Sequence, residues 1–276
     1  MEIRVPGTTM TMMAVAAILG IIIPAVLYIY LRKKKHVDNM PFWIGGAVFV
    51  VFAMVLERAA LFGVSQLSGW EDIKGNLLLY AVIGGLFAGV FEETGRLAAF
   101  TTVLKKKRGN DANALMYGAG HGGTEAVLIL SLTMVNNLVL CFMANRGNTA
   151  ALSAGGTDVT QIMRDLAAIS PLMFLVGVAE RVSAVALHIS LSVLVWFAVK
   201  NKRQRLLYPA AVLIHAGVDA VAVLLAGTGM HVLFVELAVY ALTGLSICAA
   251  VAVWKRNTGG EADVEQPGEA PLSPVS

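Results

Sequence analysis

The sequence predicts an all-α fold, a polytopic bundle of about seven transmembrane helices. Two observations support this prediction. The 276 residues are 57% hydrophobic and 14% charged, whereas roughly a quarter of the residues in a soluble domain are charged. In addition, several apolar runs reach the ~20 residues that a helix needs to cross a bilayer. We therefore expect a multi-pass protein of a cell membrane, such as the bacterial inner or plasma membrane, with the lipid bilayer as its surroundings.

The apolar runs also give the expected boundaries of the spans. These lie at about 8–31, 41–62, 77–104, 112–143, 171–199, 206–226 and 232–254. Together they form one helical membrane domain over residues 1–256. The remainder, 257–276, is rich in Pro, Gly and Glu and poor in apolar residues, which predicts a disordered cytoplasmic tail. The polar connection before the fifth span is expected to contain a short helix near 158–168.

The basic residues predict how the spans are oriented. Basic segments follow every second span, at 32–36 (RKKKH), 105–111 (KKKRGND), 200–205 (KNKRQR) and at Lys255 and Arg256. The other side carries only isolated basic residues. By the positive-inside rule the basic side is cytoplasmic, so the N-terminus is expected outside and the C-terminus inside. Membrane topology is enough to explain the basic residues of these loops, and no nucleic-acid partner is expected.

Ionisable side chains inside the predicted spans are expected to mark function, because charges in a membrane core are costly. They fall in four motifs: FEETGR with Glu92, Glu93 and Arg96; YGAGHGGTE with Tyr117, His121 and Glu125; AERVSAVALH with Glu180, Arg181 and His188; and LIHAGVD with His215 and Asp219. Counted from the basic end of each span, the glutamate pair and the three histidines lie about 10–12 residues in, which is about 15–18 Å at the helical rise. Their common depth predicts that four helices meet at one site.

The spacing within the motifs suggests how the histidines are held. His121 and Glu125, like His215 and Asp219, are four residues apart and share a helix face. A carboxylate in that position can accept the second N–H of the imidazole and fix its tautomer. The glycines around His121 favour close helix packing, and they are also expected to leave space for water or a peptide backbone beside the ring.

The adjacent glutamates predict acid–base chemistry. Two neighbouring carboxylates in a low dielectric cannot both ionise cheaply, and Arg96, three residues after Glu93, can neutralise one of them. The other would be suited to general acid or base work. Glu180 and Arg181 lie nearer the outer end of their span, and the sequence leaves open whether they form a structural ion pair or belong to the site.

These motifs resemble the signature of a known group of enzymes. A glutamate pair followed by Arg96, then Tyr117-x-x-x-His121, then His215-x-x-x-Asp219 is similar to the pattern of the CaaX- and bacteriocin-processing intramembrane proteases. The fuller set, with FEETGR, GHGGTE and the AER…H span, is closer to the YhfC-type intramembrane metallopeptidases. Two departures are that the arginine follows the glutamates one residue sooner than in the CaaX-type pattern and that His188 has no counterpart there.

The resemblance implies hydrolysis of a peptide bond in a membrane-embedded or membrane-associated substrate. It gives Glu92 or Glu93 the role of activating water, makes His121 and His215 metal ligands or oxyanion stabilisers, and has Asp219 orient His215. Three imidazoles at one depth, His121, His188 and His215, could also supply three ligands of a divalent metal, Zn²⁺ above all, and leave a fourth position for water. Arg96 and Glu125 complete the expected site.

Other functions are compatible with the same residues. A mechanism without metal would use the glutamates to activate water and the histidines to stabilise the oxyanion. A transporter or a proton or metal-ion pathway also uses midplane carboxylates and imidazoles, although matched halves with broken helices, typical of transporters, are not visible. A membrane scaffold held together by polar contacts would explain the charges but not their common depth.

Overall fold

The computed structural model describes residues 4–147 and 159–258, and the elements in this part of the chain are all helical. The predicted tail lies outside the described residues, apart from 257–258, which end the last helix. The elements are α1 (Gly7–Lys35), α2 (Met40–Val48), η1 (Phe49–Glu57), α3 (Arg58–Ser65), α4 (Trp70–Gly75), α5 (Leu77–Thr101), η2 (Lys105–Lys107), α6 (Ala112–Glu125), η3 (Ala126–Ser131), α7 (Leu132–Asn145), α9 (Val159–Ala168), α10 (Met173–Lys200), η4 (Lys202–Gln204), α11 (Leu207–Gly227) and α12 (Val232–Thr258).

The predicted all-α fold with seven spans is confirmed. Over the described ranges, seven helices are long and apolar enough to cross a membrane, and two of them are composite. The second span runs through α2, η1 and α3, and the fourth through α6, η3 and α7. Both composites contain a stretch of π-helix, η1 and η3. The short helix expected near 158–168 is α9, whose Met163 and Leu166 are buried against the bundle.

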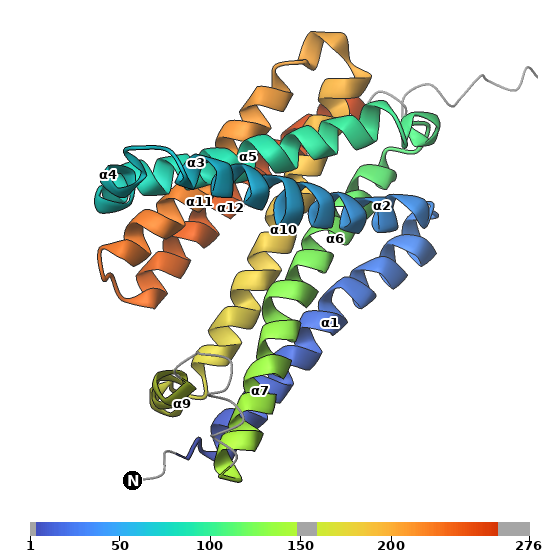
Figure 1. Cartoon of the computed structure of the whole chain (residues 1–276). Helices are drawn as coiled ribbons and strands as arrows, with labels where there is room; N and C mark the ends of the chain where they lie inside the picture. Colours follow the sequence, from blue (N-terminus) through green and yellow to red (C-terminus); the bar gives the residue numbers. More distant parts are fainter. Residues whose placement is uncertain (1–3, 148–158, 259–276) are drawn as a thin grey trace, which may run out of the picture.

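The helix ends that carry the basic residues lie together, at the upper right of Figure 1. We call this end of the molecule the basic face. The opposite face carries α4, α9 and the connection between α11 and α12, toward the lower left. Between the faces, α1, α6 with α7, and α10 run side by side, and α11 packs along α5. Helix α10 is the most buried span, so it forms the centre of the bundle.

The glycines of α6 allow three helices to approach it closely. A Cβ atom added at Gly118 would lie 2.5 Å from Cα of Ile189 in α10, and one added at Gly120 would overlap the backbone of Phe42 in α2. At Gly123 it would lie 2.5 Å from Cβ of Pro24 in α1. Close packing is therefore confirmed, but the space expected beside the imidazole is filled by these neighbouring helices.

This packing predicts that Gly120→Ala destabilises the protein. The new methyl group has backbone as its neighbour and cannot be accommodated by a side-chain rotation, and overpacking costs about 1–3 kcal/mol. Gly84→Ala in α5 is the matched control, because nothing lies within 4 Å of its added Cβ. Thermal unfolding in detergent should show a lower midpoint for Gly120→Ala alone. Equal midpoints for the two variants would contradict the close contact between α2 and α6.

Candidate metal and catalytic site

The structure brings the predicted site residues together from four helices. Those that are buried are Glu92, Glu93 and Arg96 of α5, His121 of α6, His188 of α10 and His215 of α11. Glu125 of α6 and Asp219 of α11 lie beside them and are more accessible. They lie at a common depth because every α-helix has the same rise per residue, so residues at equal distances along their helices from the basic face lie at equal depths in the bundle.

Glu92, His121 and His188 form the closest group of potential metal ligands. One ligand atom from each residue lies within 4.8 Å of the other two, and all three side chains are buried. Nε2 of His121 lies 2.8 Å from Oε2 of Glu92, and Nδ1 of His188 lies 4.0 Å from the same oxygen. The three imidazoles are also near neighbours, with ring centroids 4.6 Å apart for His121 and His188 and 5.2 Å apart for His188 and His215.

The donor set fits a metal ion. Two imidazoles and one carboxylate are one of the known three-residue sets of catalytic zinc. Donors about 2 Å from a shared tetrahedral ion are roughly 3.3 Å apart, and the 2.8 Å and 4.0 Å separations to Glu92 bracket this value. The cluster can therefore hold a metal. His215, which the sequence predicted as the third ligand, is not part of this group. Its Nδ1 atom contacts Glu93 at 2.9 Å, and its Nε2 atom lies 4.0 Å from Glu92 and 3.6 Å from Asp219.

Glu93 and Arg96 form a fully buried ion pair beside His188 and His215, as the spacing predicted. Nδ1 of His215 lies 2.9 Å from Oε1 of Glu93, so Glu93, rather than Asp219, makes the shorter contact to this ring. Nη2 of Arg96 donates to Nδ1 of His188 at 3.1 Å. Since arginine only donates, Nδ1 accepts and Nε2 of a neutral His188 carries the proton.

Glu125 has a different partner from the one that the spacing predicted. It contacts Nε2 of His188 at 2.7 Å rather than His121, and the remaining nitrogen of His121, Nδ1, has no hydrogen-bond partner among the described residues. The reason is that Arg181 binds this carboxylate from α10, because Nη1 of Arg181 donates to Oε1 of Glu125 at 2.6 Å. The carboxylate thus lies against two side chains on α10 instead of one on its own helix.

Arg181 is the residue whose place in the site was left undecided by the sequence. Its Nε atom donates to Glu180 at 3.1 Å while Nη1 holds Glu125, so it joins the outer glutamate to the carboxylate behind His188. A signal for this role was present: Arg181 precedes His188 by seven residues, two helical turns, and so lies on the same face of α10.

A polar cavity of about 140 Å³ adjoins the cluster. Glu92, His188 and His215 line its inner end, and Asp219 is part of its wall. Oδ2 of Asp219 lies 3.6 Å from Nε2 of His215, and 39% of the Asp219 side chain is exposed. The cavity therefore gives water access to the two imidazoles and to a carboxylate that can exchange protons with it.

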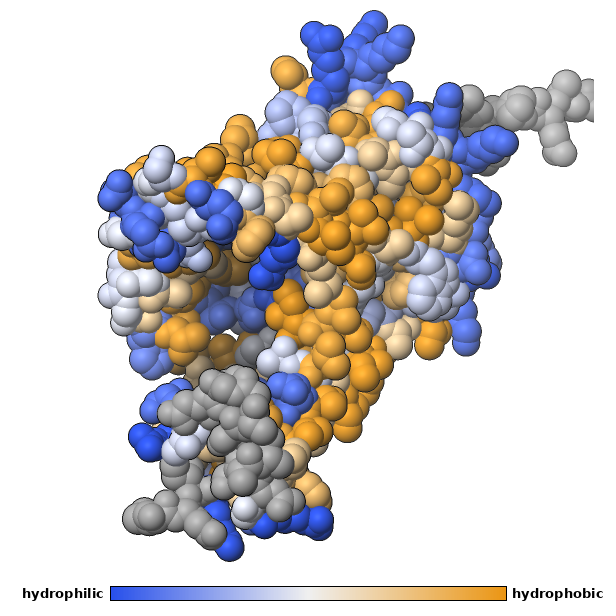
Figure 2. All heavy atoms as spheres, viewed as in Figure 1, coloured by the Kyte–Doolittle hydropathy of each residue, from blue (hydrophilic) through white to orange (hydrophobic). Residues whose placement is uncertain are grey.

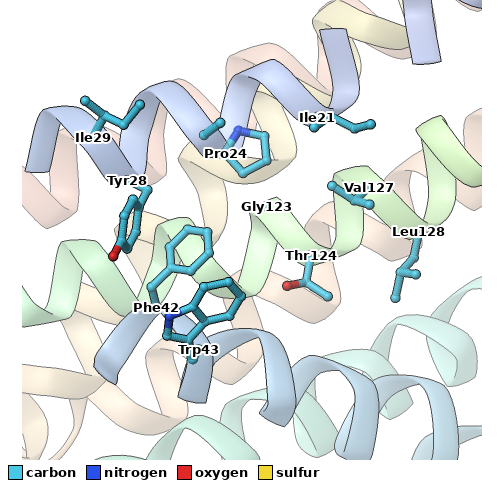
Figure 3. A pocket seen from close by; sticks show the side chains of 11 residues that line it. Ile21, Pro24, Tyr28, Ile29, Phe42, Trp43, Gly123, Thr124, Val127 and Leu128 are labelled. Carbon is cyan, nitrogen blue, oxygen red and sulfur yellow. The ribbon is translucent and has the colours of Figure 1, made fainter. Parts of the chain in front are cut away.

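A larger groove, of about 570 Å³, lies on the other side of α6 between α1 and α2 (Figure 3). Pro24, Tyr28, Trp43 and Thr124 point into it. No carboxylate or imidazole is present among the described residues that line it. Its lining is mostly apolar and lacks carboxylates and imidazoles for acid–base or metal chemistry, so the smaller polar cavity is the candidate reaction site.

Comparison with known proteins agrees with the geometry. The family model described as YhfC intramembrane metalloprotease matches residues 19–239. The chain is 34% identical over 242 residues to the Bacillus subtilis (strain 168) protein named "Uncharacterized membrane protein YhfC", covering 85% of this chain and 92% of that protein. No solved structure matches the chain. The matched region contains all four motifs that build the buried cluster, and the chain belongs to the YhfC intramembrane metalloprotease family.

Proposed function

We propose that the protein is an intramembrane metallopeptidase that hydrolyses a peptide bond of a membrane-embedded or membrane-associated polypeptide. The observation that carries the proposal is the buried group of Glu92, His121 and His188, whose ligand atoms lie within 4.8 Å of one another. Two imidazoles and a carboxylate leave a position free for water, as catalytic zinc requires. A divalent ion held there, Zn²⁺ in our proposal, would supply a Lewis acid and a water with a near-neutral pKa.

The chain's own residues have separate tasks in this proposal. Glu92, His121 and His188 hold the ion. Arg96 contacts Nδ1 of His188 and is paired with Glu93; an ion on Nδ1 would take the place of the first contact and leave the ion pair in place. Glu125 holds the far nitrogen of His188 and so fixes the orientation of the ring.

His215 and Asp219 are the proposed proton carriers. Glu93 fixes Nδ1 of His215, which leaves Nε2 directed between Glu92 and Asp219 at the wall of the polar cavity. Asp219 can accept a proton from cavity water because much of its side chain is exposed. His215, within 4 Å of Asp219, can then deliver a proton to the leaving amine, which is the second half of general acid–base hydrolysis.

Metal analysis with single replacements tests the function. The full chain is purified in detergent, stripped with a chelator, reloaded with zinc and assayed for bound zinc and for cleavage of single-span membrane peptides. Glu92→Gln should lose both properties, whereas His231→Ala, in the exposed loop before α12, should keep both. Hydrolysis in metal-free protein that still needs Glu92 would support the mechanism without metal. Zinc or proton flux across proteoliposomes without hydrolysis would support the transporter function instead.

Arg181→Gln is expected to weaken zinc binding by about 10–100-fold, the usual cost of losing a residue that orients a metal ligand. The cause is that Glu125, released from Arg181, no longer holds His188 in place. Arg58→Gln is the matched control, because Arg58 is exposed at the start of α3. Competition with a zinc chelator gives the affinity of each variant. Unchanged affinity in Arg181→Gln would restrict this arginine to a structural ion pair.

A further inference from the structure

The polar cavity extends from the cluster in one direction only. Helix α10 runs from the opposite face to the basic face, and α11 runs the other way. The cavity is lined on α10 by Glu180 and Arg181, which precede His188, and on α11 by Asp219 and Ala222, which follow His215. Each of these residues therefore lies between the histidines and the opposite face.

Helix α12 confirms the direction. Its first turns begin at the opposite face, and there Val235 and Glu236 line the cavity. Figure 2 shows the surface hollowed at the same end, between the part that carries α4 and the part that carries α9, with hydrophilic atoms inside the hollow. The exposed fractions of the Glu180 and Asp219 side chains, 33% and 39%, show that water reaches the walls from there.

On the other side of the cluster the bundle is closed by large side chains. Phe100, Tyr117 and Trp196 are fully buried and lie on α5, α6 and α10, each between the cluster and the basic face. Phe100 packs against both others, with ring centroids 4.7 Å from Tyr117 and 5.0 Å from Trp196 (edge-on in both cases). Tyr117 in turn stacks on His121 at 6.0 Å.

Polar contacts at the basic face hold this closure in place. Nε1 of Trp196 donates to Asp111 at 2.7 Å, and the same carboxylate is paired with Lys200. Nδ2 of Asn113 donates to the carbonyl oxygen of Lys107 at 2.8 Å, which fixes the connection before α6. Aromatic packing and loop contacts thus both separate the cluster from the basic face.

We infer that water and substrate reach the site from the opposite face. This inference rests on the proposed function and narrows its substrate class. The substrates are membrane-anchored polypeptides whose cleaved bond lies in the half of the bilayer away from the basic loops. Polypeptides presented at the basic face, such as lipidated proteins anchored on the cytoplasmic surface, are excluded if the positive-inside orientation holds.

Thiol accessibility tests this inference without relying on catalysis. In a Cys141→Ala/Cys248→Ser background, Ala222→Cys places a thiol in the cavity, and Ala211→Cys places one on the same helix at the basic side of His215. Sealed vesicles of both orientations are treated with a charged, membrane-impermeant thiol reagent. Ser68→Cys and Gly109→Cys, in exposed connections at the opposite and basic faces, mark which face each vesicle presents.

We expect Ala222→Cys to react in the same vesicles as Ser68→Cys and Ala211→Cys to react in neither. Val239→Cys, which lines the cavity from α12, provides a second cavity position if Ala222→Cys fails to fold. Reaction of the cavity thiols from the side of Gly109→Cys, or from neither side, would overturn the inference. If the thiols are labelled as expected but the protein neither binds zinc nor cleaves peptides, the access route stands and the peptidase function is refuted. Failure of the access route and failure of the proposed function are therefore distinguishable.

Discussion

Replacing either His121 or His188 with alanine is expected to remove the bound ion and to reduce hydrolysis by about a thousandfold or more. Each ring supplies one of three proposed ligands, and no other imidazole or carboxylate among the described residues completes an equivalent group. A catalytic metal supplies several kcal/mol of transition-state stabilisation, and every 1.36 kcal/mol is a factor of ten in rate. Bound zinc per chain and the single-turnover rate are the two measurements.

Two further replacements, His231→Ala and His215→Ala, separate loss of metal binding from general damage to the bundle. His231→Ala removes an exposed imidazole and should leave both measurements unchanged. His215→Ala should lower the rate while the protein keeps its zinc, because this residue lies outside the ligand group and contacts Glu93 and Asp219. If His215→Ala loses the ion and Glu92→Gln keeps it, the three-histidine ligand set that was expected from the sequence would replace the one proposed from the structure.

Glu93→Gln is expected to destabilise the protein by about 3–5 kcal/mol, the usual cost of removing one partner of a buried ion pair. The Glu93 and Arg96 side chains are both 0% exposed. Without the carboxylate, the guanidinium would remain charged in a low-dielectric interior, with His188 and the face of the Tyr117 ring as its neighbours. Unfolding in detergent, followed by circular dichroism, measures the loss.

The double variant Glu93→Gln/Arg96→Met is the control for this interpretation. Removing both charges removes the unpaired guanidinium, so the double variant should be at least as stable as Glu93→Gln alone and far more stable than additivity predicts. Additive losses from the two single variants would mean that Glu93 and Arg96 stabilise the bundle independently. A loss below 1 kcal/mol for Glu93→Gln would contradict the burial of the pair.

The fold and the height of the site could be predicted because both depend on distance along a helix. Apolar run length gives the spans, and a constant rise per residue puts Glu92, His121 and His215 at one level. Neither quantity depends on which neighbours a helix has. The orientation of the termini rests on the positive-inside rule and remains a prediction.

The partners of each side chain could not be predicted, because they depend on how each helix is rotated and where it crosses its neighbours. Residues four apart share a face, yet Glu125 turns to His188 and Arg181 on α10 instead of His121. His121 and Glu125 both lie in α6, before the π-helical stretch η3 begins at Ala126, so the partner of Glu125 follows from the neighbouring helix α10 and not from a change in helix phase. The positions of α5 and α11 around the site likewise make Glu92, and not His215, complete the group with His121 and His188.

X-ray absorption at the zinc edge of the reloaded protein tests the central claim most directly. We expect one zinc per chain with nitrogen and oxygen ligands at about 2.0–2.1 Å, the signature of two imidazoles and no sulfur. The imidazole signal should disappear when His121 and His188 are both replaced. Protein that retains no zinc at all, or a zinc whose imidazole ligands survive that double replacement, would contradict a metal centre built on Glu92, His121 and His188.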